Sequence, residues 1–276
     1  MKLIFLDADG TLFHHEGYIP KSAFIAIQKA QQNGHKVCLC TGRQKAEIYG
    51  DLTKINYDGI VAGSGAYTEV HNKILKEQSF DDDQLKSILD YTLQKKIPVI
   101  FESSLGLKPN IFAMKKVMEL HKEQCSSLSS KELEQHGLHA VYTLIQACHN
   151  IKHFPVNKIS FLESSTSYEE IKHHFKDTFD IVPATFAPFG KQSGEISSKT
   201  ITKAHGMETL MNYYHIQQKD VIAIGDGFND LCMFEKAGYS IAMGNASLEV
   251  QKKADYVTSS LEEDGIYTAF HYLNLF

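Results

Sequence analysis

The first segment with reactive side chains is DADGT, in which Asp7 and Asp9 flank an alanine and precede a glycine. A carboxylate can attack phosphorus and form an acyl phosphate, which divides one difficult hydrolysis into two easier displacements. A second carboxylate two residues away can protonate the leaving oxygen and later take a proton from the attacking water. The pair therefore suits a phosphoryl transfer with Asp7 as the nucleophile and Asp9 as the general acid and base.

A second acidic segment, GDGFND, contains Asp226 near the other end of the chain. Carboxylate oxygens without neighbouring Cys or His ligands suit Mg²⁺, which keeps several waters and takes few ligands from the protein. A cation is also needed, because an anionic nucleophile is repelled by an anionic ester unless that charge is offset. We expect Asp7 and Asp226 to bind Mg²⁺.

Donors for a phosphoryl group occur in two further segments. The Thr41 hydroxyl and the Gly42 amide follow an apolar run, and both can donate hydrogen bonds to phosphoryl oxygens. Lys203, at the start of an expected helix, can add a positive charge. Taken singly, Thr41 would be a helix N-cap and Lys203 a solvated lysine, so the phosphate-binding interpretation depends on all the segments together.

Secondary-structure elements must bring these segments together, and the hydrophobic pattern predicts which elements do so. Short apolar runs predict strands, and helical spacing of apolar residues predicts the helices between them. Ligands bind at the carboxyl ends of such strands, where the polar segments lie. The sequence predicts a doubly wound parallel sheet, a Rossmann-like α/β core, with strands at 2–6, 36–40, 59–62, 220–224 and 239–242 and helices at 21–33 and 203–213.

The middle of the chain alternates less regularly and predicts an inserted second domain at 82–188, which leaves a core of residues 1–81 and 189–276. Residues 104–137 are harder to interpret and could be helical or partly mobile. Within the inserted domain the pattern predicts helices at 82–94 and 167–175 and strands at 97–101, 139–146, 157–162 and 179–185.

Composition argues against several classes of partner. The net charge of −5 and the pI near 6.3 do not favour nucleic acid. No apolar stretch reaches the roughly 18 residues that span a bilayer, so we expect a cytoplasmic protein without signal peptide or membrane anchor. The five cysteines form no CxxC pair and their number is odd, which is typical of reduced thiols in a core. The sequence does not indicate an oligomeric state.

Four motifs resemble those of the haloacid dehalogenase (HAD) superfamily: FLDADGTL, LCTGR, TITKAHG and GDGFNDLCM. The inserted domain and the ending EEDGI (262–266) resemble Cof-type phosphatases of this superfamily, which have a class IIB α+β cap domain. The resemblance covers both core segments nearly from end to end. In the inserted domain it depends only on position and coarse pattern.

The resemblance implies roles for residues that match the motifs. Asp7 would be both nucleophile and metal ligand, and Asp9 would bind the metal through its backbone carbonyl in addition to its acid–base role. The remaining implied roles are phosphate binding by Thr41 and Lys203, metal binding by Asp226, and support of the metal and phosphate by Asn229 and Asp230.

Two positions depart from the family pattern. Ser64 stands where such phosphatases commonly have Asn, which removes the basis for a substrate contact at that position. Ala204 replaces the usual glycine after Lys203, a change that a helix tolerates well. Arg43 could contact substrate or lie on the surface. The adjacent pairs His14-His15 and His173-His174 have no evident third ligand, so we expect them to be solvated.

The expected activity is hydrolysis of a small phosphorylated metabolite, either a sugar phosphate or a phosphorylated cofactor such as pyridoxal phosphate or flavin mononucleotide. A sugar-phosphate mutase is an alternative, because it uses the same aspartyl phosphate. A catalytically silent metabolite-binding protein is another, although it has no chemical need for Asp7, Asp9, Lys203 and Asp226 together. A metal-free dehalogenase would have no evident use for Asp9 and Asp226.

Overall fold

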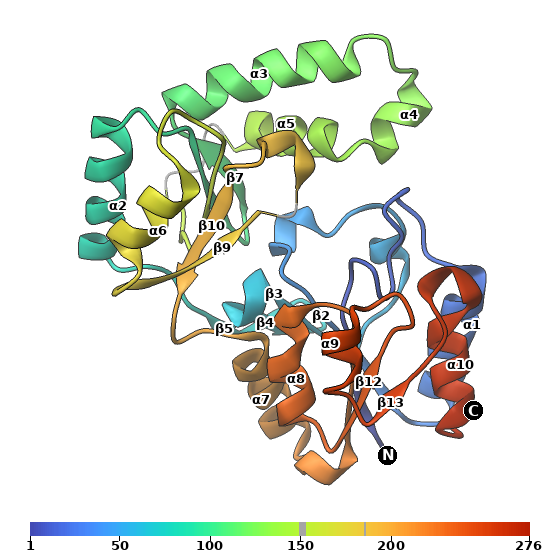
Figure 1. The fold of residues 1–276 in the computed structure, drawn as a ribbon. Coiled ribbons are helices and arrows are strands. Elements are labelled where there is room, and N and C mark those ends of the chain that lie inside the picture. Colours follow the sequence, from blue (N-terminus) through green and yellow to red (C-terminus); the bar gives the residue numbers. More distant parts are fainter. Residues whose placement is uncertain (149–152, 185) are drawn as a thin grey trace. The chain divides into compact units, whose positions relative to one another are not determined.

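The structure, a computed structural model, describes residues 1–148, 153–184 and 186–276 and divides into two compact units (Figure 1). Unit 1 contains residues 1–43, 48–77 and 202–276, and unit 2 contains residues 44–47 and 78–201. Unit 1 is therefore built from separated parts of the chain. Within the described ranges, no helix combines the length and the apolar character that a bilayer crossing requires.

The sheet of unit 1 has the strand order β13-β12-β11-β1-β2-β3-β4-β5. The strands from β13 to β3 are parallel, so their carboxyl ends lie at one edge of the sheet. The bounds are β1 Leu3–Leu6, β2 Lys36–Cys40, β3 Gly59–Ala62, β4 Tyr67–Val70, β5 Lys73–Glu77, β11 Val221–Gly225, β12 Tyr239–Ala242 and β13 Tyr256–Val257.

Helices cover both faces of this sheet, because alternate strand residues point to opposite sides. Ile4 and Leu6 pack with residues of α1 and α10 on one face, and Leu3 and Phe5 pack with residues of α7 and α8 on the other. This arrangement confirms the predicted doubly wound α/β core. The helices are α1 Lys21–Gln32, α7 Lys203–Tyr214, α8 Leu231–Lys236, α9 Leu248–Gln251 and α10 Gly265–Tyr272.

A hairpin extends the parallel strands with two antiparallel ones, β4 and β5. The connecting residues His71 and Asn72 have φ values of 47° and 64°, as in the tight turns that match the twist of paired strands. The sequence did not indicate this hairpin, because β5 is largely exposed and has no apolar run. The sheet is consequently mixed at this edge.

Unit 2 contains an antiparallel sheet with the strand order β7-β6-β8-β10-β9. Ile159 and Phe161 pack with residues of α2 and α6 on one face, and Ile100 packs with residues of α3 and α5. The bounds are β6 Val99–Ser103, β7 Gly106–Pro109, β8 Lys158–Phe161, β9 Phe179–Pro183, β10 Gly194–Ser198, α2 Asp82–Gln94, α3 Ile111–Cys125, α4 Ser130–Gln135, α5 Gly137–Ala147 and α6 Tyr168–Phe175.

The strand predicted at 139–146 is wrong, because these residues lie in helix α5. Leu138 and Ile145 are buried seven residues apart, which is two helical turns, and this spacing places both on one helix face. A short apolar run cannot be assigned to strand or helix by hydrophobicity alone. The hard-to-interpret residues 104–137 form β7 and helices α3 and α4.

The second unit also extends beyond the predicted limit at residue 188. Strand β10 pairs with both β8 and β9, so its backbone hydrogen bonds tie it to the sheet of unit 2. The 3₁₀ turn Lys45–Glu47, which follows β2 in the sequence, also belongs to unit 2. Both assignments to unit 2 depend on contacts between residues that are distant in the sequence. The sequence around residue 188 therefore has no pattern that would indicate where the unit ends.

Gly206 provides a test of how helix α7 packs on β3. A Cβ atom at Gly206 would lie 2.2 Å from Cγ1 of Val61. Alanine favours a helix by about 1 kcal/mol over glycine, but overpacking a core costs about 1–3 kcal/mol. We expect Gly206→Ala to lower the unfolding temperature and Val61→Ala to restore much of it in the double variant. Thermal unfolding of both single variants and the double variant measures this coupling, and additive effects would contradict the proposed contact.

Candidate active site

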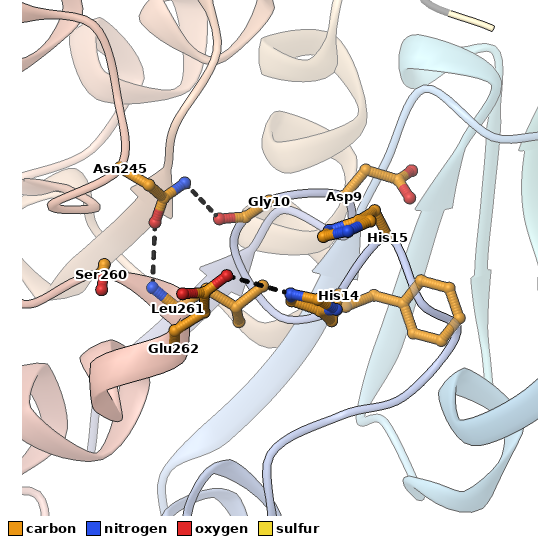
Figure 2. Close-up of a pocket in the computed structure, with 9 residues that line it drawn as sticks. Asp9, Gly10, His14, His15, Asn245, Ser260, Leu261 and Glu262 are labelled. Atoms are coloured by element: carbon orange, nitrogen blue, oxygen red, sulfur yellow. Dashed lines mark hydrogen bonds and ion pairs between the residues drawn. The ribbon is translucent and has the colours of Figure 1, made fainter. Parts of the chain in front are cut away.

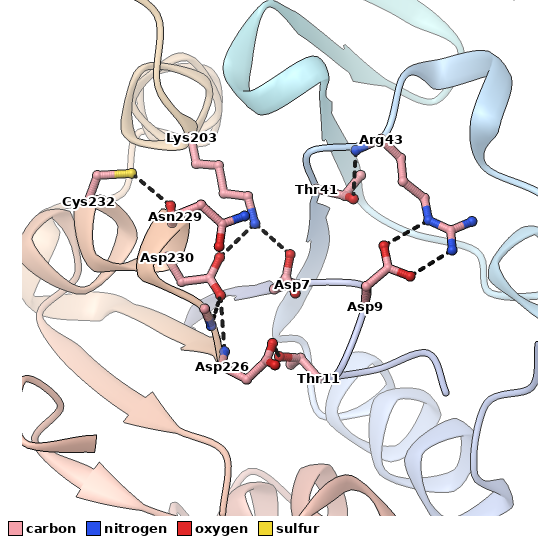
Figure 3. Close-up of polar contacts among 11 residues, drawn as sticks. Asp7, Asp9, Thr11, Thr41, Arg43, Lys203, Asp226, Asn229, Asp230 and Cys232 are labelled. Atoms are coloured by element: carbon pink, nitrogen blue, oxygen red, sulfur yellow. Dashed lines mark hydrogen bonds and ion pairs between the residues drawn. The ribbon is translucent and has the colours of Figure 1, made fainter. Parts of the chain in front are cut away.

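Polar side chains from three loops and from the start of one helix converge at the carboxyl edge of the parallel strands (Figure 3). Asp7 follows β1, Thr41 follows β2, and Asp226 and Asp230 follow β11, while Lys203 begins α7. These strands are neighbours in the sheet although they are far apart in the sequence. The fold thus places at one edge of the sheet side chains that lie in separate sequence motifs.

Lys203 lies at the centre of this group. Its Nζ atom is 2.5 Å from Oδ1 of Asp7 and 2.6 Å from Oδ1 of Asp230. The residue is only 1% exposed, unlike an ordinary lysine in the first turn of a helix. Burial alone would lower the pKa of Lys203, but the Asp230 and Asp7 carboxylates outweigh it and raise this pKa well above its usual value. The lysine therefore remains a fixed cation.

Asp7 is held in an environment that resists its ionisation. Burial and then the negative charge of Asp230 raise the pKa of Asp7 well above its usual value, and the charge of Lys203 only partly offsets this. Oδ2 of Asp230 accepts hydrogen bonds from the backbone N–H groups of Asp226 and Gly227, at 3.0 and 2.9 Å. Asp230 therefore binds both Lys203 and the backbone of the loop after β11.

Asp7, Asp226 and Asp230 form a cluster in which carboxylate oxygens lie within 4.8 Å of one another. A single lysine does not balance three carboxylates. Burial is also the main reason that the pKa of Asp226 rises to about 6, even though Thr11 donates a hydrogen bond of 2.9 Å to its Oδ1. Clustered oxygens with excess negative charge fit a hard divalent cation such as Mg²⁺.

The Asp9 carboxylate points away from this cluster toward Arg43 (Figure 3). Nη2 and Nε of Arg43 donate to the two carboxylate oxygens at 2.6 and 2.9 Å. The guanidinium carbon lies 4.9 and 5.0 Å from the ring centroids of Phe13 and Tyr49, which restrict its movement. Arg43 thus contacts the expected acid–base residue, a role that the sequence did not indicate.

Thr41 is 1% exposed and lies where β2 ends. Its Oγ1 accepts a hydrogen bond of 3.1 Å from the backbone N–H of Arg43, so its own proton is available for another acceptor. A Cβ atom at Gly42 would lie 3.5 Å from Oγ of Ser64, which places Ser64 beside this turn. Ser64 has a φ of 55°, so the position that departs from the family pattern is in a left-handed conformation.

Asn229 is exposed, and its backbone oxygen accepts a hydrogen bond of 3.3 Å from Sγ of Cys232. Among the described residues, hydrogen bonds join the Asp230 side chain to Lys203 and to the backbone of Asp226, and none does so for the Asn229 side chain. Thr11, which received no role from the sequence, does join the cluster, because its hydroxyl donates to Oδ1 of the Asp226 carboxylate. Its position inside DADGT was the available signal.

A pocket with a volume of about 310 Å³ opens beside Asp9 within unit 1 (Figure 2). His14 is 5% exposed, so its predicted solvation is wrong. The cause is tertiary: its ring stacks on Tyr18 at 4.7 Å, and its Nε2 lies 3.3 Å from Oε1 of Glu262. The residues that line the pocket are Asp9, Gly10, Phe13, His14, His15, Asn245, Ser260, Leu261 and Glu262.

The four cysteines Cys38, Cys40, Cys125 and Cys148 are buried free thiols, and Cys232 is a partly exposed one. Burial raises the pKa of the Cys38 and Cys40 thiols well above the usual value, which keeps them protonated. They therefore behave as small core side chains, as the sequence indicated.

Known proteins resemble this chain in sequence and in fold. The sequence matches the family of haloacid dehalogenase-like hydrolases over residues 4–270. It is 29% identical over 280 residues to 5-amino-6-(5-phospho-D-ribitylamino)uracil phosphatase YwtE of Bacillus subtilis, with 96% of each chain covered. YitU of the same organism, which has the same named activity, is 26% identical over 273 residues that cover 96% of this chain and 94% of YitU.

Among solved structures, the HAD subclass IIB sugar phosphatase BT4131 has a TM-score of 0.74 and 24% sequence identity, with 100% of both chains covered. This likeness concerns the fold. Together with the sequence match, it confirms the resemblance that the four motifs indicated.

The raised pKa of Asp226 predicts that Asp226→Asn stabilises the cation-free protein at neutral pH. The pKa is about 6 when folded against 3.8 ordinarily, so stability present below pH 3.8 is lost as the pH rises to 6. Asparagine cannot ionise and can still accept the Thr11 hydrogen bond. With a chelator present to remove bound cations, we expect Asp226→Asn to have a higher unfolding temperature than wild type at pH 7. The difference in unfolding temperature should be smaller at pH 4. A variant less stable than wild type at pH 7 would contradict this account.

Proposed function

This chain belongs to the haloacid dehalogenase-like hydrolases, and we propose that it is a phosphatase that hydrolyses a small phosphate monoester through a phosphorylated Asp7 with Mg²⁺ bound beside it. The observation that carries the proposal is the buried contact of Lys203 with Asp7 inside the cluster of carboxylates. A buried, charge-paired carboxylate at the end of a parallel strand is suited to nucleophilic attack. The named activities of YwtE and YitU support the reaction class.

The first step joins phosphorus to Asp7. A carboxylate oxygen of Asp7 attacks phosphorus, and the bond from phosphorus to the leaving oxygen breaks with its electron pair. Asp9 in its protonated form gives its proton to that oxygen, so the products are the free alcohol and a phosphorylated aspartate. Lys203 and the Thr41 hydroxyl stabilise negative charge on the phosphoryl group, because both donate toward it.

The second step reverses the role of Asp9. Its carboxylate takes a proton from water while the water oxygen attacks phosphorus. The bond between phosphorus and the Asp7 oxygen breaks, which releases inorganic phosphate and restores the Asp7 carboxylate. Asp9 is then protonated and ready for another substrate.

Asp7 and Asp226 would hold Mg²⁺ through their carboxylates, with the Asp9 carbonyl as a further oxygen by analogy with the family. Asp230 keeps the loop and Lys203 in place, because its oxygens already accept three hydrogen bonds. When bound, the cation offsets the repulsion between nucleophile and ester and polarises the phosphoryl oxygens. This fits a cluster in which burial raises the pKa of both Asp7 and Asp226.

Arg43 affects when Asp9 can act. The bidentate contact occupies both oxygens of the Asp9 carboxylate, whereas the first step needs one of them to reach the leaving oxygen. We propose that Asp9 leaves Arg43 and turns toward the leaving oxygen when substrate binds. The pocket beside Asp9 would then accommodate part of the leaving group, and its volume of about 310 Å³ suits a small metabolite.

We propose that the predicted insertion, residues 82–188 with β10 added, acts as the cap that selects the substrate. Gln44 and Asn157, both in unit 2, are 0% and 4% exposed. Within the described residues, both atoms of each side-chain amide are buried without a hydrogen-bond partner. Such groups are costly unless they gain partners, so we assign them to recognition of a hydroxylated or heterocyclic leaving group.

The proposed substrate class is a sugar phosphate or a phosphorylated cofactor precursor. YwtE and YitU act by name on a phosphorylated ribitylaminouracil, which combines a polyol chain with a heterocycle. The substrate panel should therefore include that compound, sugar phosphates, pyridoxal phosphate and flavin mononucleotide.

Replacement of the nucleophile tests the reaction directly. We expect wild type to release phosphate from p-nitrophenyl phosphate and from some of the panel only with Mg²⁺, and Asp7→Asn to lose at least about 10³-fold in kcat. Asp220→Asn is the matched control, because Asp220 adjoins the opposite end of β11 and pairs with Lys2 there. No turnover by folded, metal-loaded wild type would overturn the proposal and leave the mutase and the silent binding protein.

Substitution of Asp9 tests its role as the acid. Asp9→Asn should reduce kcat by about 10²–10⁴-fold for an alkyl phosphate, whose leaving oxygen needs a proton. The loss should be much smaller in the phosphorylation step with p-nitrophenyl phosphate, because p-nitrophenolate leaves without protonation. Single-turnover release of each alcohol measures this step separately from hydrolysis of the phosphorylated enzyme. Equal losses with both substrates would exclude Asp9 as the acid.

A further inference from the structure

Asn245 connects two loops that lie at the carboxyl edge of the sheet (Figure 2). It follows β12 and belongs to neither acidic motif. Its Nδ2 donates a hydrogen bond of 2.8 Å to the backbone oxygen of Gly10, and its Oδ1 accepts one of 2.9 Å from the backbone N–H of Leu261. One partner can only accept and the other can only donate, so the orientation of the amide is determined.

The Gly10 oxygen belongs to the peptide that joins Gly10 to Thr11, and both residues contact Asp226. Gly10 has a φ of 82°, and a Cβ atom there would lie 2.3 Å from Oδ2 of Asp226. The Thr11 hydroxyl donates to Oδ1 of the same carboxylate at 2.9 Å. Both oxygens of the Asp226 carboxylate therefore lie against the two residues that this peptide joins.

We propose that Asn245 is a positioning residue that fixes the peptide between Gly10 and Thr11, and through it holds the Asp226 carboxylate in the geometry that binds the divalent cation. This inference rests on the proposed function, because it gives Asn245 a task only if Asp226 is a ligand. Asn245 acts through its hydrogen bond to Gly10, and its contact with Leu261 anchors the amide from the other side.

The alternative is that Asn245 has a purely structural role and does not affect Asp226. In such a role Asn245 would only stabilise its own loop, a task that Gln251 already performs. Nε2 of Gln251 donates to the backbone oxygens of Gly244 and Ala246, each at 3.0 Å. Gln251 thus braces the same loop from its helix side without a hydrogen bond to Gly10. The two side chains form a matched pair, since one reaches the nucleophile loop and the other does not.

The test measures cation binding in the absence of substrate, with Mn²⁺ as the probe in calorimetry on the full chain. Loss of a hydrogen bond changes an equilibrium by about fivefold, so we expect Asn245→Ala and the similarly sized Asn245→Leu to weaken Mn²⁺ binding about five- to tenfold. Gln251→Ala should lower the unfolding temperature without shifting the Kd for Mn²⁺. Asn245 is exposed, so its variants should fold.

Activity gives an independent measure. The Mg²⁺ concentration for half-maximal turnover should rise by about the same factor in the Asn245 variants and should not change in Gln251→Ala. Unchanged Mn²⁺ binding in both Asn245 variants, or an equal loss in Gln251→Ala, would overturn the inference. If wild type itself bound no cation and showed no turnover, the proposed function would fall as well, so the two failures are distinguishable.

Discussion

The ion pair between Lys203 and Asp7 is the constraint on which the rest of the site depends. Several carboxylates cannot share a buried space unless a cation lies among them, because desolvation and mutual repulsion both oppose ionisation. Lys203 supplies one charge and touches two of the three carboxylates. The excess negative charge that remains fits a hard divalent cation such as Mg²⁺.

The fold satisfies this constraint by placing rigid elements around a small volume. The nucleophile and the carboxylates after β11 lie at the ends of adjacent buried strands, and the lysine begins a helix that packs on the same sheet. Backbone groups complete the arrangement: Asp230 binds the N–H groups of its own loop, and Asn245 binds the Gly10 carbonyl. Charged side chains on flexible loops could not remain in such a cluster without these supports.

The proposed function gives the two units different tasks. Unit 1 contains the proposed nucleophile, the carboxylate cluster and the proposed phosphate donors. Unit 2 has its own core but buries polar groups that a stable core would avoid. One is Glu102, whose pKa rises to about 7 mainly by burial, although Lys158 lies 3.0 Å away. Such groups are suited to recognition, because their desolvation is already complete before a ligand arrives.

The sequence by itself determined the parallel strands, the residues at their ends and the pairing of two distant segments into one core, since these follow from local hydrophobic runs and short motifs. It therefore predicted roles for Asp7, Thr41, Lys203 and Asp226 without coordinates. It could not distinguish helix α5 from a strand, because a short apolar run carries no period of its own. The burial of Lys203 and His14, the contact of Arg43 with Asp9 and the bridge from Asn245 to Gly10 were decided by tertiary structure. Each of these features depends on side chains that come into contact only when the sheet has formed. A local sequence pattern does not indicate contacts between residues that are distant in the chain.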